Sequence, residues 1–454
     1  MRRSAALAVL LFFLGCQSRD GSSRSPVGER ADAVQAADRK ILGAAQPFVA
    51  DETLRAREEA LRQSKRLRRE AAWRTVEKIL APVALAEPLP PPTAGSRVPA
   101  WQTWYDREDA RRVFHRLYDG IGSQRRRARA SFTGAELDAA FAWNTRAVEE
   151  LPNWPADRYQ QYLASLDEAA EVAGVGGIAR VAYSPATLQH LFGSYKAITD
   201  CLARGTSDAG SAWAPCLRAA FPSDAAVIKS SWVRADFGRK LPTYDTSAEG
   251  LAQRLSPDGG VSWEVPDGEA NPGPEAIYTL KLANGNTYRL AGLHIITKEL
   301  DHWAWTSLWW SASPDLDFGA DRPASIEGPW RHYKMCTVTS FDERDPAPGG
   351  GFDEHPSLAG ALTAVHGEPT WCSNPYIERG EGNASTNCVG CHQHAGTSAL
   401  TSEILSDAAR FPMRGRTLLR NDFPVDYAWT VNQGERLGYY FADELAFYDQ
   451  SDPP

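Results

Sequence analysis

The spacing of apolar residues changes along the chain from a helical period to a strand period. Between residues 51 and 81, apolar side chains recur at helical spacing with Arg and Glu between them, which predicts helix. The segment "VPAWQTWYDREDARRVFHRLYDGIG" (Val98–Gly122) places Val113, Phe114 and Leu117 on one face and ends in glycines. The helical pattern continues to about residue 220, so the N-terminal half is predicted to be helical.

The following segment has the composition of strands. Asn284-Gly285 between two of its runs predicts a hairpin turn. After about residue 347 the chain is rich in Gly, Pro and Asn, which predicts loops. The predicted class is therefore α+β, with a helical N-terminal half, a small antiparallel β unit and a loop-rich C-terminal region. The four predicted strands are "AAVIKSSWVRA" (Ala225–Ala235), "AIYTLKL" (Ala276–Leu282), "TYRLAGLHIIT" (Thr287–Thr297) and "HWAWTSLWW" (His302–Trp310).

Composition and charge narrow the class of protein. Hydrophobic residues make up 43% of the chain, enough for a globular core. The formal net charge is -8, and no sustained basic stripe crosses the globular part, so no nucleic-acid partner is expected. The segment "PLPPPTAG" (Pro88–Gly95) is a stiff linker. The predicted division is 1–15 signal peptide, 16–30 tether, 31–96 helical segment and linker, 97–222 helical domain, 223–346 β-rich domain and 347–454 C-terminal region.

The first residues predict export. Arg2 and Arg3 precede the apolar run Ala5–Leu14, which is too short to span a bilayer as a helix. "FLGC" (Phe13–Cys16) is similar to a bacterial lipobox, which implies cleavage before Cys16, lipidation of its thiol and a membrane anchor. We expect a periplasmic or outer-membrane lipoprotein, with plain secretion as the alternative.

The chain has seven cysteines. With Cys16 assigned to the lipid and Cys388 and Cys391 to a separate motif, four remain. In an oxidising compartment, the pairing that uses neighbours in sequence gives two disulfides, while buried free thiols are the alternative. The predicted disulfides are Cys201–Cys216 and Cys336–Cys372.

The stretch "CVGCH" (Cys388–His392) predicts covalent haem attachment. Two thiols at this spacing can add to the porphyrin vinyl groups, and the next residue, His392, can supply the proximal imidazole. Zinc would require further ligands, and a thioredoxin-like site would require a helix start after a strand. We therefore expect one haem c, with zinc or a redox disulfide as alternatives.

The second axial position of the haem iron has three possible states: ligation by Met413, ligation by His294, or an open or water-bound site. Lys298, Glu299 and His302, in the same segment as His294, are further candidates for lining the distal side. Two arginines close to Met413 could pair with the haem propionates, because guanidinium matches carboxylate geometry. These are Arg414 and Arg416.

Two further groups of residues invite a functional interpretation. Asp315, Asp317 and Asp321 lie in one loop and could hold calcium, although the ligand order of an EF-hand is absent. The tryptophans of the segment 303–310 suit a haem wall, a sugar-binding platform or ordinary core packing of a strand.

Four segments together resemble a group of uncharacterised secreted bacterial proteins of the cytochrome c family. They are "VPAWQTWYDREDARRVFHRLYDGIG", "HIITKELDHWAWTSLWWSASPDLDFGADRP", "GPWRHYKMCTVTSFDERDP" and "WCSNPYIERGEGNASTNCVGCHQHAG". The resemblance covers about residues 98–439 and implies haem attachment at Cys388, Cys391 and His392. It implies no particular reaction or redox partner.

Two classes of function follow. The first is an envelope-anchored mono-haem c-type cytochrome that transfers single electrons between partner proteins. The second is a haem c-dependent periplasmic enzyme, or a haem sensor, with an open distal site in the β-rich unit where acid–base groups could act. The sequence identifies neither the redox partners nor a substrate.

Overall fold

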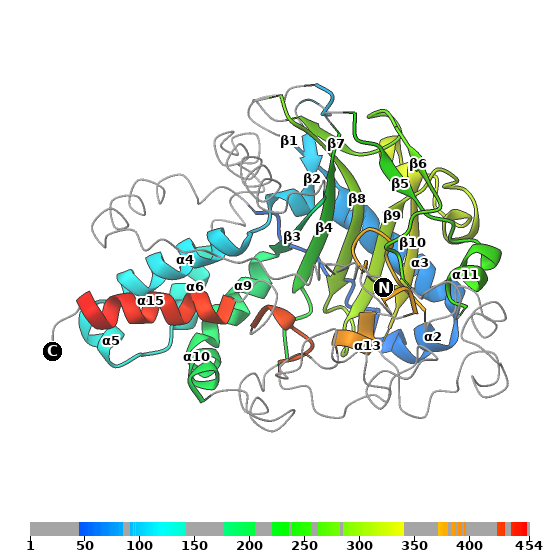
Figure 1. Ribbon diagram of the computed structural model, residues 1–454. Helices are drawn as coiled ribbons and strands as arrows, with labels where there is room; N and C mark the ends of the chain where they lie inside the picture. The colour runs from blue at the N-terminus through cyan, green and yellow to red at the C-terminus, as the bar shows by residue number, and fades with distance from the viewer. Residues whose placement is uncertain are drawn as a thin grey trace, which may run out of the picture.

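A six-stranded antiparallel sheet forms the centre of the molecule (Figure 1). The strands are arranged in the order β10-β9-β8-β4-β3, and β7 pairs with one end of β8. The structure is a computed structural model that describes residues 45–84, 91–93, 95, 97–141, 177–204, 220–235, 238–256, 262–281, 285–339, 371–379, 383–385, 388–392, 395, 425–431 and 437–451. The sheet strands are β3 (Gly177–Tyr183), β4 (Ala226–Arg234), β7 (Thr279–Lys281), β8 (Thr287–Thr297), β9 (Ala304–Trp310) and β10 (Tyr333–Val338).

Four of these strands, β4, β7, β8 and β9, form where the sequence predicts them, because β-branched and aromatic residues are concentrated there. The β7–β8 pair is antiparallel, and Gly285, between the two strands, has a φ of 93°, which glycine adopts without steric cost. The predicted α+β class is confirmed. Two strands of this sheet were not predicted: β10, and β3, which lies in a range predicted to be helical.

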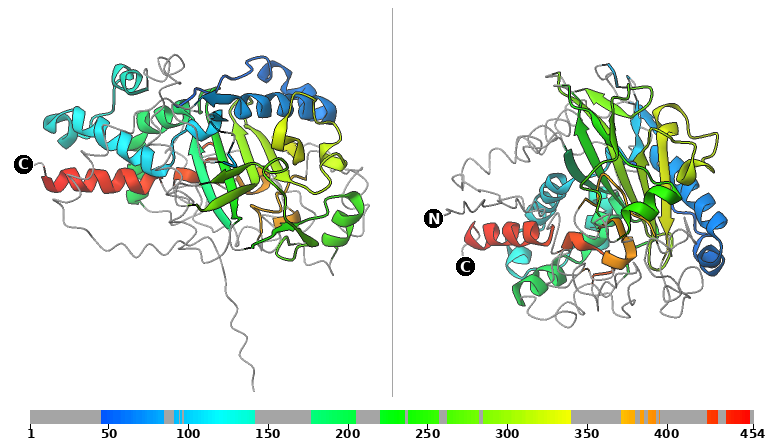
Figure 2. Two further views of the ribbon diagram at one scale, coloured as in Figure 1. Left: turned by 90° about the horizontal axis from the view of Figure 1, so that it is seen from above. Right: turned by 45° about the vertical axis from the view of Figure 1, so that its right-hand side comes forward.

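One face of the sheet is covered by the N-terminal helices. The predicted helix over residues 51–81 is confirmed as η1 (Arg55–Arg57), α2 (Glu58–Gln63) and α3 (Lys65–Leu80), separated at Ser64, whose side chain caps α3. Arg69 on α3 donates to the backbone carbonyl of Met335 on β10, 2.6 Å away. Figure 2 shows α3 on one side of the sheet and the short helix α13 (Cys388–His392) on the other.

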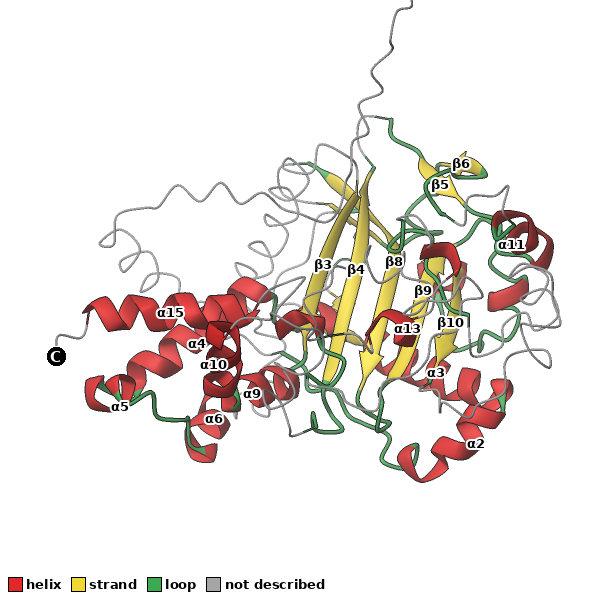
Figure 3. Cartoon of the chain, turned by 60° about the horizontal axis from the view of Figure 1, so that its bottom comes forward, coloured by secondary structure: helices red, strands yellow, loops and turns green. Residues whose placement is uncertain are grey.

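A group of helices lies beyond the β3 edge of the sheet (Figure 3). The C-terminal helix α15 packs against α4 and α10, and the rings of Phe114 and Phe441 stack with centroids 4.5 Å apart. Helix α15 was not predicted and lies in the region expected to be loop-rich. These helices are α4 (Arg107–Gly120), α5 (Ser123–Arg127), α6 (Gly134–Phe141), α9 (Pro185–Gly193), α10 (Tyr195–Arg204) and α15 (Leu437–Ser451).

The remaining elements are short. Two small two-stranded sheets, β1–β2 and β5–β6, lie outside the main sheet. Within the described ranges, no helix has the length and apolarity needed to cross a membrane. The short elements are β1 (Pro82–Ala84), β2 (Arg97–Pro99), η2 (Ala100–Thr103), β5 (Leu241–Thr243), α11 (Ala248–Arg254), β6 (Gly268–Ala270), η5 (Asp317–Gly319), η6 (Gly328–His332), η9 (Asn383–Ser385) and η10 (Trp429–Val431).

Buried apolar side chains from the predicted helical, β-rich and C-terminal ranges belong to one contiguous cluster. Phe114, Trp232, Trp305 and Phe441 are all members and are at most 1% exposed. The predicted domain boundaries therefore do not separate independent cores in the described part of the chain. The predicted signal peptide, the tether and Cys16 lie outside the described residues.

Candidate functional site

The "CVGCH" sequence forms the helix α13, which lies on the sheet face opposite α3 (Figure 2). Cys388 and Val389 are buried. The segment that precedes α13 is fixed by two hydrogen bonds: Trp371 Nε1 donates to the Ala384 carbonyl at 2.9 Å, and Ser373 Oγ donates to the Asn383 carbonyl at 2.8 Å. The position of α13 therefore depends on how residues 371–379 are attached to the sheet.

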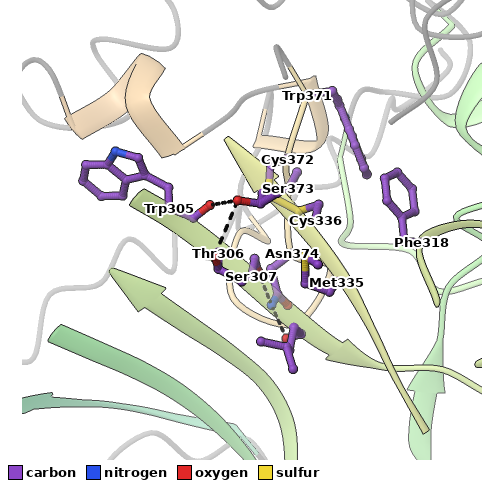
Figure 4. Close-up of a disulfide and its surroundings, with 12 residues drawn as sticks. Trp305, Thr306, Ser307, Phe318, Met335, Cys336, Trp371, Cys372, Ser373 and Asn374 are labelled. Carbon is purple, nitrogen blue, oxygen red and sulfur yellow. Dashed lines mark hydrogen bonds between the residues drawn. A yellow bond between two sulfur atoms is a disulfide. The ribbon is translucent and has the colours of Figure 1, made fainter. Parts of the chain in front are cut away.

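A disulfide attaches that segment. Cys336 on β10 is bonded to Cys372, which confirms this predicted pairing (Figure 4). Asn374 then bridges to β9, because its Nδ2 donates to Ser307 Oγ at 2.9 Å and to the Leu308 carbonyl at 2.8 Å. A Cβ atom at Gly292 on β8 would lie 2.7 Å from Asn374 Oδ1, so glycine permits this close approach.

His392, the last residue of α13, is held in one tautomer. Its Nδ1 lies 3.0 Å from the carbonyl oxygen of Tyr427. A carbonyl can only accept, so Nδ1 carries the proton and Nε2 keeps its lone pair. Burial lowers the pKa of His392 to about 4, which keeps the imidazole neutral at physiological pH. A neutral imidazole with an available Nε2 is the form that ligates a metal.

His294 on β8 lies on the same face of the sheet. Cross-strand pairing aligns it with Lys229 on β4 and Ser307 on β9. The side chain is buried, and its Nε2 has no hydrogen-bond partner among the described residues. Burial lowers the pKa of His294 well below its usual value, and the positive charge of Lys229 and the neighbouring imidazole of His392 lower it further. His294 is therefore a second neutral imidazole close to His392.

Glu378 is the acidic neighbour of His294. Its Oε2 lies 3.9 Å from His294 Nε2, too far for a hydrogen bond, and it also accepts from the backbone N–H of Asn374. Burial raises the pKa of Glu378 to about 7, so this carboxyl is partly protonated at neutral pH. Glu378 was not among the predicted site residues, because its place beside His294 depends on contacts that are distant in sequence. These include the Cys336–Cys372 disulfide, the hydrogen bonds of Asn374 to β9, and the Ser231 hydroxyl on β4, which donates to the Tyr376 carbonyl at 3.0 Å.

The other three residues predicted to line the distal side, Lys298, Glu299 and His302, have different surroundings. Lys298 forms an ion pair with Asp426, at 2.9 Å. Glu299 accepts from Thr75 and Lys78 of α3 and therefore belongs to the opposite side of the sheet. His302 lies beside Tyr427, with ring centroids 5.7 Å apart. Of the three, Glu299 is excluded from the surroundings of His392.

The three aspartates of the predicted calcium loop are paired with basic side chains instead. Asp317 pairs with Lys334 at 3.1 Å, Asp321 accepts two hydrogen bonds from Arg69, and Asp315 pairs with Arg322. No cluster of three or more His, Cys, Asp or Glu side chains suited to a metal occurs in the described ranges. The arrangement gives the calcium interpretation no support.

The tryptophan run is part of the core. All four side chains are at most 4% exposed, which rules out a surface sugar platform for them. The indole of Trp305 also contacts the ring of His392, so this residue combines core packing with a wall of the site. The four residues are Trp303, Trp305, Trp309 and Trp310.

Met413, Arg414 and Arg416, which were predicted to contribute to the haem site, lie outside the described residues. Cys201 is disulfide-bonded, and its predicted partner, Cys216, also lies outside them. The backbone of Cys391 lies within the helix α13.

Comparisons with known proteins found no matching family model, no similar curated protein and no similar solved structure.

Proposed function

We propose that this chain is a mono-haem c-type cytochrome of the bacterial cell envelope and that it transfers single electrons. Cys388 and Cys391 would hold the haem through thioether bonds, and His392 would ligate its iron through Nε2. The export signal and the Cys16 lipobox support attachment outside the cytoplasm, where covalent haem proteins mature. When bound, haem supplies a reversible one-electron couple.

The observation that carries this proposal is the hydrogen bond between His392 Nδ1 and the Tyr427 carbonyl. Metal-ligating histidines usually donate their other ring N–H to a carbonyl or carboxylate, which fixes the tautomer and raises the basicity of the ligating nitrogen. In this chain the hydrogen bond joins residues 35 positions apart, so the fold orients His392 independently of its own helix.

The proposal is tested by producing the full chain in a bacterium with a c-type cytochrome maturation system. Haem that stays with the polypeptide after denaturation is the expected result, together with a spectrum that changes between oxidised and reduced forms. The variant Cys388→Ser/Cys391→Ser should lose covalent haem. The matched variant Cys336→Ser/Cys372→Ser, which also removes two cysteines, should keep it. Wild-type chain without covalent haem would refute the proposal.

A second function, a haem enzyme or sensor, is favoured by one observation. His294 is buried, its Nε2 has no hydrogen-bond partner among the described residues, and it lies 3.9 Å from the carboxyl of Glu378, whose pKa is about 7. Such a pair is suited to exchange protons with a substrate. If His294 instead ligates iron, the site is closed and electron transfer remains the simpler function. Carbon monoxide binding to the ferrous protein distinguishes the two: it should be rapid for an enzyme or sensor and slow or absent for an electron carrier.

A further inference from the structure

The turn that supplies the acceptor for His392 has an unusual backbone. Asp426 and Tyr427 are consecutive non-glycine residues with φ values of 46° and 67°. Aspartate tolerates the left-handed region, but a bulky tyrosine rarely adopts it. Such conformations cost free energy and persist only where the surrounding structure enforces them, which occurs most often at functional sites. The turn must therefore be held by contacts outside itself.

Three contacts hold Asp426, and they come from three different places in the fold. Its Oδ1 accepts from Lys298 Nζ at 2.9 Å, its Oδ2 from the Phe221 backbone N–H at 3.0 Å, and its carbonyl from Trp303 Nε1 at 3.0 Å. Asp426 is 8% exposed and Lys298 is 1% exposed. The position of the turn is thus fixed to the end of β8, to the segment before β4 and to the β8–β9 connection.

The ion pair is the contact that most needs an explanation. Removing two charges from water is costly, and apolar residues of similar volume often stabilise a fold as well as a buried ion pair does. A buried pair is therefore weak evidence for stability alone. The ion pair does supply a defined geometry. The buried carboxylate of Asp426 is neutralised only where the ammonium group of Lys298 can reach it, so the pair restricts where the turn can lie.

We propose that Lys298 and Asp426 are positioning residues for His392: they hold the strained turn so that the Tyr427 carbonyl faces Nδ1 of the imidazole. Neither side chain contacts His392 in any described interaction; the effect passes through the backbone of Tyr427. The inference rests on the proposed function, because its purpose is to orient an iron ligand and to set its basicity.

Lys298→Met tests the proposal by removing the charge that fixes Asp426. Asp426→Asn is the second variant, since asparagine also tolerates the left-handed backbone and is expected to fold. Lys334→Met is the matched control: Lys334 is 2% exposed, lies on β10 and pairs with Asp317 at 3.1 Å, away from His392. Lys298→Arg keeps the charge and should restore the wild-type behaviour.

Two measurements report on His392. The first is the ¹⁵N spectrum of the full chain labelled at histidine, before haem attachment, in which the Nδ1–H tautomer of His392 should fall in Lys298→Met and Asp426→Asn. The second is the midpoint reduction potential of the haem-loaded chain. It should shift upward in both variants, because a weaker hydrogen bond at Nδ1 leaves a less basic ligand and disfavours ferric iron.

The outcomes separate this inference from the proposed function. Shifts in Lys298→Met and Asp426→Asn, with none in Lys334→Met and recovery in Lys298→Arg, support the positioning role. Equal behaviour of Lys298→Met and Lys334→Met would overturn it and leave the ion pair with a structural role alone. A chain that never binds haem would refute the proposed function, whereas the tautomer measurement would still decide the inference.

Discussion

The imidazole of His392 lies against the indole of Trp305, with ring centroids 4.5 Å apart and ring planes inclined by 52°. Trp305 is 1% exposed, and its Nε1 donates to the His302 carbonyl at 3.0 Å. The ring of Tyr427 lies 5.9 Å from the same indole. Trp305 therefore contacts both α13, through His392, and the turn that contains Tyr427, and it packs both of them against β9.

We expect Trp305→Ala to destabilise the fold by about 3–5 kcal/mol, because it removes a large buried aromatic side chain. It should also alter the absorption spectrum of the haem-loaded protein, since His392 loses its neighbour. Trp310→Ala is the control, because Trp310 is also buried but points to the opposite face of β9. Denaturant unfolding measures the loss of stability, and visible spectra report on the haem. Identical spectra for the two variants would show that the contact between Trp305 and His392 does not affect the haem.

His294→Ala should convert a low-spin haem spectrum to a high-spin one that binds carbon monoxide in the ferrous state. The reason is that His294 Nε2 is buried, neutral and without a hydrogen-bond partner among the described residues, which is the state of an imidazole able to ligate iron. His332→Ala, at the other end of the sheet in η6, should leave the spectrum unchanged. A high-spin wild-type protein would show that His294 is not a ligand.

Loss of the Cys336–Cys372 disulfide should lower the free energy of unfolding without removing haem. Its partners are 36 residues apart, and the chain-entropy model gives a contribution of about 4 kcal/mol for a loop of this length. Thermal unfolding of Cys336→Ala/Cys372→Ala, compared with wild type under oxidising conditions, checks the effect. With reductant added to both proteins, the wild type and the variant should become equally stable, and a difference that survives reduction would argue against the disulfide as its cause.

Glu136 should contribute to stability in a pH-dependent manner. Hydrogen bonds from Arg125 and from the Thr133 backbone lower its pKa from 4.5 to about 2. Because the folded pKa is depressed, the contribution is complete above about pH 4.5 and is lost as the pH falls towards about 2. The side chains of Arg125 and Glu136 are each about a third exposed, so screening by solvent limits the contribution of Glu136 to about 1 kcal/mol.

Urea unfolding of the wild type and of Glu136→Gln at about pH 7 and about pH 3 checks this pH dependence. The gap, which is the difference in the free energy of unfolding between the two proteins, should be smaller at the lower pH. Glu249→Gln, also in the first turn of an exposed helix, should give a smaller gap at both pH values because no basic partner is described for Glu249. A gap for Glu136→Gln that is constant with pH would rule out the ion pair as its source.

The apolar pattern predicted most elements of the sheet because its period is a local property. It predicted β4, β7, β8 and β9, and the helices over residues 51–81. It did not predict β10, where Lys334 is 2% exposed inside a strand. A buried lysine contradicts the usual pattern, and its burial is made possible by two partners that are distant in sequence, the carboxylate of Asp317 and the hydroxyl of Thr246.

The sequence alone determined the local chemistry of this protein. It provided the "CVGCH" spacing and the pairing of Cys336 with Cys372, because the first depends on neighbouring residues and the second on a simple inventory of cysteines. Export stays a prediction from the first residues. The tertiary structure decided which residues surround His392. His294, Glu378, Trp305 and the Tyr427 carbonyl come from four separate segments, and strand register, one disulfide and a buried ion pair bring them together. Such contacts result from the sum of many long-range interactions, which no short stretch of sequence contains.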